Sequence, residues 1–170
     1  MWGIVGEYWD QSRLAAWLVL VALGYFAVLA WKLARTDIQS RRLPDRLVLP
    51  AYPAAAVLLG SAALVGGDAG RLAGMAGGGF LLLAGYFLLR VLSPSGLGLG
   101  DVKLAGVLGL YLGFAGWSHV LAGAAAGFVL GGLWGLGLVL TGKGTGKTRI
   151  PFGPFMLAGT ALALAVPGLE

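Results

Sequence analysis

The chain has 170 residues, of which 58% are hydrophobic, only 11% are charged and 31 are glycine. Soluble domains carry about twice this share of charged residues, so the composition excludes an ordinary soluble globular domain. With no cysteine and one histidine, the sequence also excludes disulfides and cysteine-based zinc sites, and it argues against imidazole metal sites. We therefore predict an all-α polytopic membrane protein.

The charged residues divide the chain into apolar segments of about 20 residues, the length that a helical span needs. Four segments are clear: 14–31, 47–67, 72–89 and 150–169. Between Lys103 and Lys143 lie 39 residues without formal charge, too many for one span. An interfacial turn at Gly116-Trp117-Ser118-His119 divides them into two. We expect a bundle of about six spans that forms one transmembrane domain, residues 1–170.

Basic residues fall unevenly on the two sides of this topology. Ten lie on one side, namely Lys32, Arg35, Arg41, Arg42, Arg46, Arg90, Lys103, Lys143, Lys147 and Arg149, and only Arg13 and Arg71 lie on the other. Because positive residues are retained in the cytoplasm, we expect the side with ten basic residues to face the cytoplasm. Both termini would then lie on the opposite, outer side of the cytoplasmic membrane. We attribute the net charge of +5 to basic residues that set the topology and contact anionic lipid headgroups. We expect no nucleic-acid partner.

The N-terminal residues do not resemble a signal peptide. Glu7 and Asp10 precede the first apolar segment at the place where a signal peptide has basic residues. We therefore expect the first span to be retained in the protein.

Acidic residues are scarce, and three of the seven fall on the cytoplasmic side: Asp37, Asp45 and Asp101. Asp37 follows the end of the first expected span, and Asp101 opens the fourth, after the glycine run GLGLG. An acid at mid-bilayer costs about 2.5 to 3.5 kcal/mol, and less near the interface. Two acids at the same interface therefore suggest a function for Asp37 and Asp101.

Two carboxylates that lie close together share a proton, so one can accept a proton from water while the other donates to an amide. Glycines beside Asp101 would let the backbone approach the reacting centre and adopt unusual φ values. Alternatively, Asp101 only caps the fourth span, where a carboxylate meets the positive end of a helix. The residues alone leave both interpretations open.

Three segments resemble one known family. "GLGLGDVKLAGVLGLYLG" (96–113) resembles the GxGD signature of the type IV prepilin and preflagellin peptidases, which are membrane aspartic proteases. "TDIQSRRLPDRLVLP" (36–50) resembles the segment with their other aspartate, and "IPFGPFMLAG" (150–159) resembles the start of their last span. The resemblance implies that Asp37 and Asp101 are the catalytic pair, that Gly98 and Gly100 shape the active-site loop, and that no cofactor is needed.

The resemblance also implies a reaction. The enzyme would remove, at the cytoplasmic face, the short basic leader of a prepilin-like precursor, meaning a type IV pilin, an Flp pilin or a preflagellin, whose hydrophobic helix lies in the bilayer. Larger bacterial members of the family look like this chain plus a cytoplasmic region with paired cysteines that methylates the new amino terminus. Since the sequence has no cysteine, we expect a short form with peptidase activity and without N-methyltransferase activity.

Two further charged residues are candidate supporting residues. Asp45 follows Pro44 and is typical of a helix start, so capping is the simpler role and catalysis the reserve interpretation. Lys103 lies two residues after Asp101, where it could act on an aspartate through its charge or extend to the lipid headgroups.

A basic stretch near the C-terminus, "TGKGTGKTR" (141–149), looks at first like a phosphate-binding loop. That motif requires glycine where Thr141 stands, and it needs a strand-to-helix setting. We interpret the stretch as a basic cytoplasmic loop.

Small and helix-breaking residues mark two other spans. Gly123, Gly127, Gly131 and Gly135 form a small-residue groove on the fifth span. The groove could serve packing within the monomer, dimerisation or docking of a substrate helix, so the oligomeric state stays open. Pro50 and Pro53 predict a kink near the cytoplasmic end of the second span.

Two other functions compete with the peptidase interpretation. One is a small proton- or cation-coupled transporter with a path lined by acids. The other is a noncatalytic pilus assembly factor that holds pilin helices. The remaining spans carry no acid near mid-bilayer, which favours the peptidase over the transporter.

Overall fold

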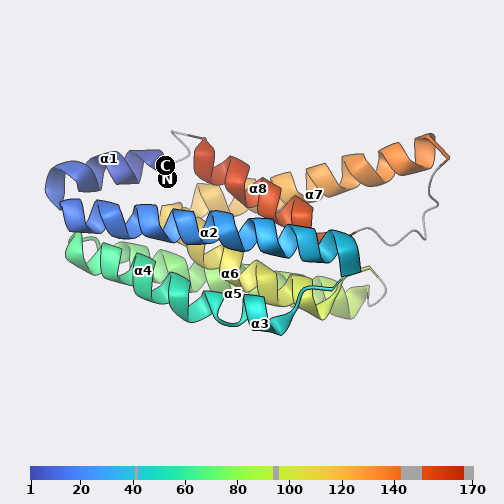
Figure 1. Ribbon diagram of the computed structural model, residues 1–170, viewed down its shortest axis with the longest axis horizontal. Coiled ribbons are helices and arrows are strands. Elements are labelled where there is room, and N and C mark those ends of the chain that lie inside the picture. The colour runs from blue at the N-terminus through green and yellow to red at the C-terminus, as the bar shows by residue number, and fades with distance from the viewer. Residues whose placement is uncertain (41, 94–95, 143–150, 167–170) are drawn as a thin grey trace.

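The computed structural model describes residues 1–40, 42–93, 96–142 and 151–166. Within these residues the chain forms helices and no strand, which confirms the all-α class. The helices are α1 (Trp2–Gln11), α2 (Arg13–Ser40), α3 (Asp45–Val48), α4 (Ala51–Val65), α5 (Gly70–Leu92), α6 (Leu99–Ala115), α7 (Trp117–Leu140) and α8 (Gly153–Ala165). The long helices run roughly along one common axis (Figure 1).

The six expected spans correspond to α2, α3 with α4, α5, α6, α7 and α8. Four of these helical segments are long and apolar enough to cross a membrane: α2, Asp45–Val65, α5 and α7. The shorter α6 lies in the middle of the bundle, where it contacts α3, α4, α5, α7 and α8. The last expected span, 150–169, begins and ends in residues outside the described ranges, and its described part is the shorter apolar helix α8.

Helix α2 is longer than the sequence predicts. It continues nine residues past position 31 to Ser40, so Asp37 lies inside the helix and does not follow its end. The hydroxyls of Thr36 and Ser40 donate to backbone carbonyls one turn earlier, at 2.8 Å each, which keeps these polar residues compatible with the helix. At 1.5 Å per residue, α2 spans about 42 Å and exceeds a hydrocarbon core of about 30 Å.

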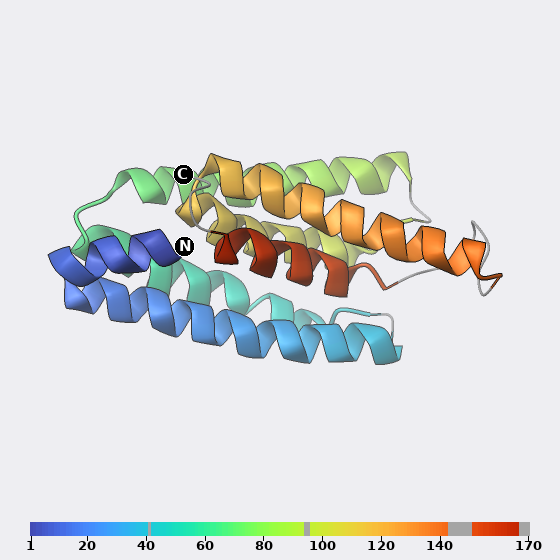
Figure 2. The ribbon, with the colours of Figure 1, turned by 90° about the horizontal axis from the view of Figure 1, so that it is seen from above.

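The sequence analysis did not predict α1. Its apolar residues Ile4 and Tyr8 are buried, whereas Trp2 and Trp9 on the other side are exposed. This spacing of four residues is the signal of an amphipathic helix, although it covers only ten residues. The helix folds back along α2 and lies beside the C-terminal end of α8 in both views (Figures 1 and 2).

Two helix breaks follow from proline and glycine. The second span is divided at Pro50 into α3 and α4, which confirms the expected kink, because proline lacks the N–H that a continuous helix requires. The expected turn at 116–119 is narrower than predicted. Only Gly116 leaves the helical conformation, with φ of 138°, a region open to glycine, while Trp117 already begins α7.

Glycines set the closest helix contacts. A Cβ added to Gly78 of α5 would lie 2.6 Å from the carbonyl oxygen of Gly109 in α6, so the two backbones touch. Gly123 of α7 packs against Leu112, and Gly127 packs against Met156 of α8. The interpretation of the fifth-span groove as packing within the monomer is therefore confirmed at these two positions.

The bundle has two ends, which we name by their charged residues. The aspartate end consists of the C-terminal end of α2, all of α3 and the starts of α6 and α8; the arginine end consists of the α1–α2 and α4–α5 connections and the end of α6. At the aspartate end, α7 extends beyond its neighbours in both views (Figures 1 and 2).

The described basic residues divide between these ends as the topology predicts. Lys32, Arg35, Arg42, Arg46, Arg90 and Lys103 lie toward the aspartate end, and Arg13 and Arg71 lie at the arginine end. Arg41, Lys143, Lys147 and Arg149 lie outside the described residues, as does nearly all of the basic stretch 141–149.

Candidate functional site

Asp37 is a buried acid near the C-terminal end of α2, with 4% of its surface exposed. Its Oδ2 accepts a hydrogen bond of 3.1 Å from the backbone N–H of Gly153, the first residue of α8. N–H groups in the first turn of a helix lack partners within that helix and favour a negative charge. The N-terminus of α8 therefore provides a binding partner for a carboxylate that is 116 residues away in the sequence.

Gly153 leaves no room for a side chain. A Cβ at this position would lie 2.8 Å from Oδ2 of Asp37, closer than nonbonded atoms approach. The segment 150–159 thus meets the segment 36–50 at a specific atom pair, although its first residue, Ile150, lies outside the described residues. Sequence reasoning missed this contact, since a backbone donor carries no residue-type signal.

Asp101 lies in the first turn of α6, as predicted. Its Oδ2 accepts a hydrogen bond of 2.9 Å from the backbone N–H of Gly98, so the capping interpretation is confirmed. The same carboxylate interacts electrostatically with Asp37 and with Arg90. Capping and proximity to Asp37 are therefore compatible at Asp101.

Leu43, in the connection after α2, contacts both the start of α6, which carries Asp101, and the start of α8, which binds Asp37. A Cβ added to Gly100 would lie 2.8 Å from Cβ of Leu43, and one added to Gly153 would lie 3.4 Å from both methyl carbons of Leu43. Leu43 therefore packs against the residue next to Asp101 and against the hydrogen-bond donor of Asp37.

The glycines beside Asp101 do not adopt the unusual backbone conformation that we expected. Gly98 has φ of −78° and Gly100 is already helical, so neither has the unusual φ that we expected. Gly100 is small because Leu43 occupies the space of a side chain. Position 100 therefore requires glycine because Leu43 approaches it closely, and not because the backbone there is left-handed.

Arg90, in the last turn of α5, is a residue that the sequence analysis did not select for the site. Its guanidinium donates to the carbonyl of Leu97, just before Gly98. The sequence signal that could have identified Arg90 is its position as a basic residue shortly before the glycine run 96–100. Arg90 therefore joins the end of α5 to the backbone that leads into α6.

The two candidate supporting residues bind each other. Nζ of Lys103 lies 2.8 Å from both carboxylate oxygens of Asp45, with the side chains 37% and 56% exposed. Helix α3 begins at Asp45 as predicted, but its N-cap residue is Pro44, which has no side-chain acceptor, so no side-chain cap forms there; the carboxylate of Asp45 binds Lys103. Lys103 accordingly pairs with an acid and does not simply extend to the headgroups.

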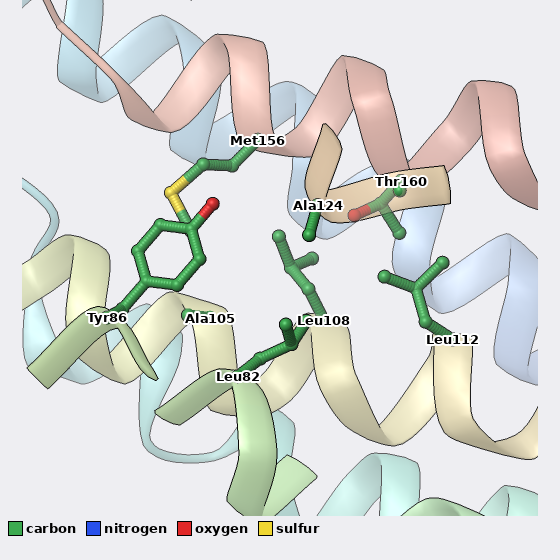
Figure 3. Close-up of a pocket in the computed structure, with 9 residues that line it drawn as sticks. Leu82, Tyr86, Ala105, Leu108, Leu112, Ala124, Met156 and Thr160 are labelled. Atoms are coloured by element: carbon green, nitrogen blue, oxygen red, sulfur yellow. The ribbon is translucent and has the colours of Figure 1, made fainter. Parts of the chain in front are cut away.

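A small, partly open pocket lies between α5, α6, α7 and α8. Its volume is about 10 Å³, room for about one water molecule. Figure 3 shows Tyr86 reaching toward Met156 across it, with Leu108 and Thr160 also in the lining. Neither Asp37 nor Asp101 is among its lining residues, and the pocket is too small to admit a peptide.

The arrangement is suited to acid–base chemistry. Within the described residues, each of the two acids accepts one hydrogen bond from a backbone N–H, and a carboxylate has about four acceptor positions in all. Two interacting carboxylates can hold one proton between them, so that one accepts while the other donates. In the described part of the chain, no group of three or more His, Cys, Asp or Glu residues could hold a metal ion.

Comparison with known proteins identifies the family. The family model described as the type IV leader peptidase family matches residues 24–136. The chain is 35% identical over 133 residues to a prepilin leader peptidase/N-methyltransferase of Bacillus subtilis (strain 168), covering 76% of this chain and 49% of that protein. It is 34% identical over 152 residues to a protein of the same name from Burkholderia pseudomallei (strain 1026b), covering 84% and 46%.

A third relative of the same name, from Aeromonas salmonicida (strain A449), is 32% identical over 154 residues, covering 87% of this chain and 50% of that protein. The chain thus spans about half the length of the curated relatives it matches. No solved structure gives a significant match. The matched residues 24–136 include Asp37, Asp101 and the glycine run between them, and the chain belongs to the type IV leader peptidase family.

Proposed function

We propose that this chain is a membrane aspartic endopeptidase that removes the short basic leader from a prepilin-like precursor at the cytoplasmic membrane face. The precursor would be a type IV pilin, an Flp pilin or a preflagellin. The names of the relatives support leader-peptide cleavage. The excess of basic residues toward the aspartate end supports a cytoplasmic location for this end.

One observation carries the proposal: Asp37 and Asp101, 64 residues apart in the sequence, lie at the same end of the bundle, where Leu43 packs against both Gly153 and Gly100. Among the residues that the structure describes, each accepts a hydrogen bond from one backbone N–H, that of Gly153 for Asp37 and that of Gly98 for Asp101. Hydrogen bonds of this kind fix the direction of a carboxylate but still let it gain or lose a proton. A pair that must alternate as acid and base requires both properties.

In the proposed reaction, the ionised aspartate takes a proton from water as the water oxygen bonds to the carbonyl carbon of the scissile peptide. The protonated aspartate donates to the carbonyl oxygen. When the tetrahedral intermediate collapses, one of its hydroxyls returns its proton to the aspartate that is now ionised and the C–N bond breaks. The leaving nitrogen takes the proton that the other aspartate received from water and departs as the new amino terminus. The pair of Asp37 and Asp101 thus supplies the base and the acid.

The test is cleavage of a panel of leader-bearing precursors co-expressed in membranes, followed by mass spectrometry of the mature amino terminus. We expect wild type to remove the leader, and Asp37→Asn or Asp101→Asn to lower the rate at least about 100-fold, because each change removes a titrating group and little volume. Asp68→Asn at the arginine end is the matched control and should retain cleavage.

Two outcomes would contradict the proposal. Full activity in either Asp37→Asn or Asp101→Asn would remove that residue from the pair. A well-inserted wild type that cleaves no precursor would favour a noncatalytic assembly factor. The mass of the mature amino terminus also tests the expectation that this chain does not methylate it.

A further inference from the structure

Both the side chain and the backbone carbonyl of Lys103 bind residues of the α3–α4 segment. Its Nζ binds Asp45 of α3, and its carbonyl oxygen accepts a hydrogen bond of 2.7 Å from the hydroxyl of Tyr52 in α4. Lys103 lies in the same helix as Asp101, two residues later. One segment of the chain therefore fixes the beginning of α6 at two points.

The contact of Tyr52 depends on a glycine. Gly106 lies three residues after Lys103, nearly one helical turn further along α6. A Cβ at Gly106 would collide with the hydroxyl oxygen of Tyr52 and would lie 2.8 Å from Cδ1 of Leu83. The bare backbone at Gly106 is therefore what lets Tyr52 reach the carbonyl of Lys103.

We propose that Tyr52, with a smaller contribution from Asp45, is a positioning residue that holds Asp101 in place relative to Asp37. This inference rests on the proposed function. Tyr52 is the stronger anchor, because its hydroxyl is partly buried and acts on the rigid backbone of α6. The Asp45–Lys103 pair is half exposed, and solvent weakens such pairs. Catalysis is sensitive to displacements of about 1 Å, which can cost about 100-fold in rate.

The chain contains a matched control for Tyr52. Tyr111 also joins α6 to a neighbouring helix through its hydroxyl, which donates to the carbonyl of Ala22 in α2 at 3.1 Å. It lies ten residues beyond Asp101, about 15 Å along the helix. Tyr52→Phe and Tyr111→Phe remove the same group from the same kind of contact, and only the first contact adjoins the aspartates.

The first experiment measures kcat, KM and thermal stability of both variants with one leader-bearing precursor in lipid nanodiscs. We expect Tyr52→Phe to lower kcat about tenfold with KM unchanged, and Tyr111→Phe to stay within about twofold of wild type. Both should lose a similar, small amount of stability. Equal changes of kcat in the two variants, or a wild-type kcat in Tyr52→Phe, would overturn the inference.

A second measurement does not depend on cleavage and so separates this inference from the proposed function. Amide hydrogen exchange should become faster at residues 102–107, whose N–H groups bond to the first carbonyls of α6, in Tyr52→Phe, and it should stay at the wild-type rate there in Tyr111→Phe. Unchanged exchange in Tyr52→Phe would overturn the positioning role. If wild type cleaves no precursor while exchange responds as expected, the proposed function fails and the anchoring of α6 by Tyr52 stands.

Discussion

At the arginine end of the bundle, acids are paired with a cation, whereas at the aspartate end two acids face backbone N–H groups. Arg71 lies 2.8 Å from a carboxylate oxygen of Asp68 and 3.4 Å from one of Glu7. Its guanidinium also donates to the carbonyl of Phe114 at 3.1 Å and lies over the ring of Tyr8. These contacts join α1, α5 and α6.

At the other end, neither Asp37 nor Asp101 forms an ion pair with any residue in the described ranges. A close cation would hold a carboxylate in its ionised form, which suits a structural contact. A single N–H orients the carboxylate with a weaker bias toward the ionised form. The comparison indicates that charge at the arginine end serves assembly, and it supports the proposal that the aspartate end exchanges protons.

Among the variants that test this comparison, we expect Gly153→Ala to lower the rate of cleavage most. Gly153→Ala places a methyl group 2.8 Å from Oδ2 of Asp37, so the carboxylate must move away from its N–H donor. We expect cleavage to fall about 100-fold, as for a misplaced catalytic group. Gly24→Ala in α2 is the control, because a Cβ there has no neighbour within 4 Å.

The measurement is the initial rate of leader removal by purified, monodisperse protein in nanodiscs. Because alanine favours helix more than glycine, neither substitution should prevent folding by its backbone preference. A Gly153→Ala protein that cleaves at the wild-type rate would show that the contact between α8 and Asp37 has no role in the reaction.

At the arginine end, Arg71→Met should affect stability and spare the chemistry. The change removes the ion pairs and the hydrogen bond to Phe114, and we expect the free energy of unfolding to fall by about 2 kcal/mol. Cleavage per folded molecule should stay within about twofold of wild type, since Arg71 and Asp101 lie near opposite ends of α6.

The control for Arg71 is Arg13→Met, which removes an exposed basic residue from the same end and should change stability by less than about 0.5 kcal/mol. Denaturant titration of both variants in one detergent measures the difference. Equal stability of the two variants would contradict the assembly role of Arg71, and lost cleavage by folded Arg71→Met would contradict the separation of the two ends.

The sequence was sufficient for the six expected spans, because charges mark where an apolar span must end, but it did not predict α1. The same rule predicts Asp37 and Asp101 on one side of the membrane. It placed the end of the first span too early, since it stopped at Lys32, whereas Thr36 and Ser40 continue the helix with their own hydrogen bonds.

Other features needed the structure. The donor to Asp37 is the backbone N–H of Gly153, and neither residue type nor spacing identifies such a partner. Asp45 and Lys103 are 58 residues apart and could not be paired from the sequence. The contact between α5 and α6 did leave a signal, because Gly74 and Gly78 repeat at the same interval of four as Gly109 and Gly113.

The smallest effect is expected at Asp45, the acid that lies at the aspartate end but is paired like those at the arginine end. Asp45→Asn removes the charge that binds Lys103, while the hydrogen bond from Tyr52 to the Lys103 carbonyl remains. Exposed pairs contribute up to about 1 kcal/mol, so cleavage should fall no more than about fivefold. The rates of Asp45→Asn, Asp37→Asn and wild type, measured side by side, decide the point. A complete loss at Asp45 would place it among the reacting groups, and ion pairing would then no longer distinguish the structural acids from the two proposed to act on the substrate.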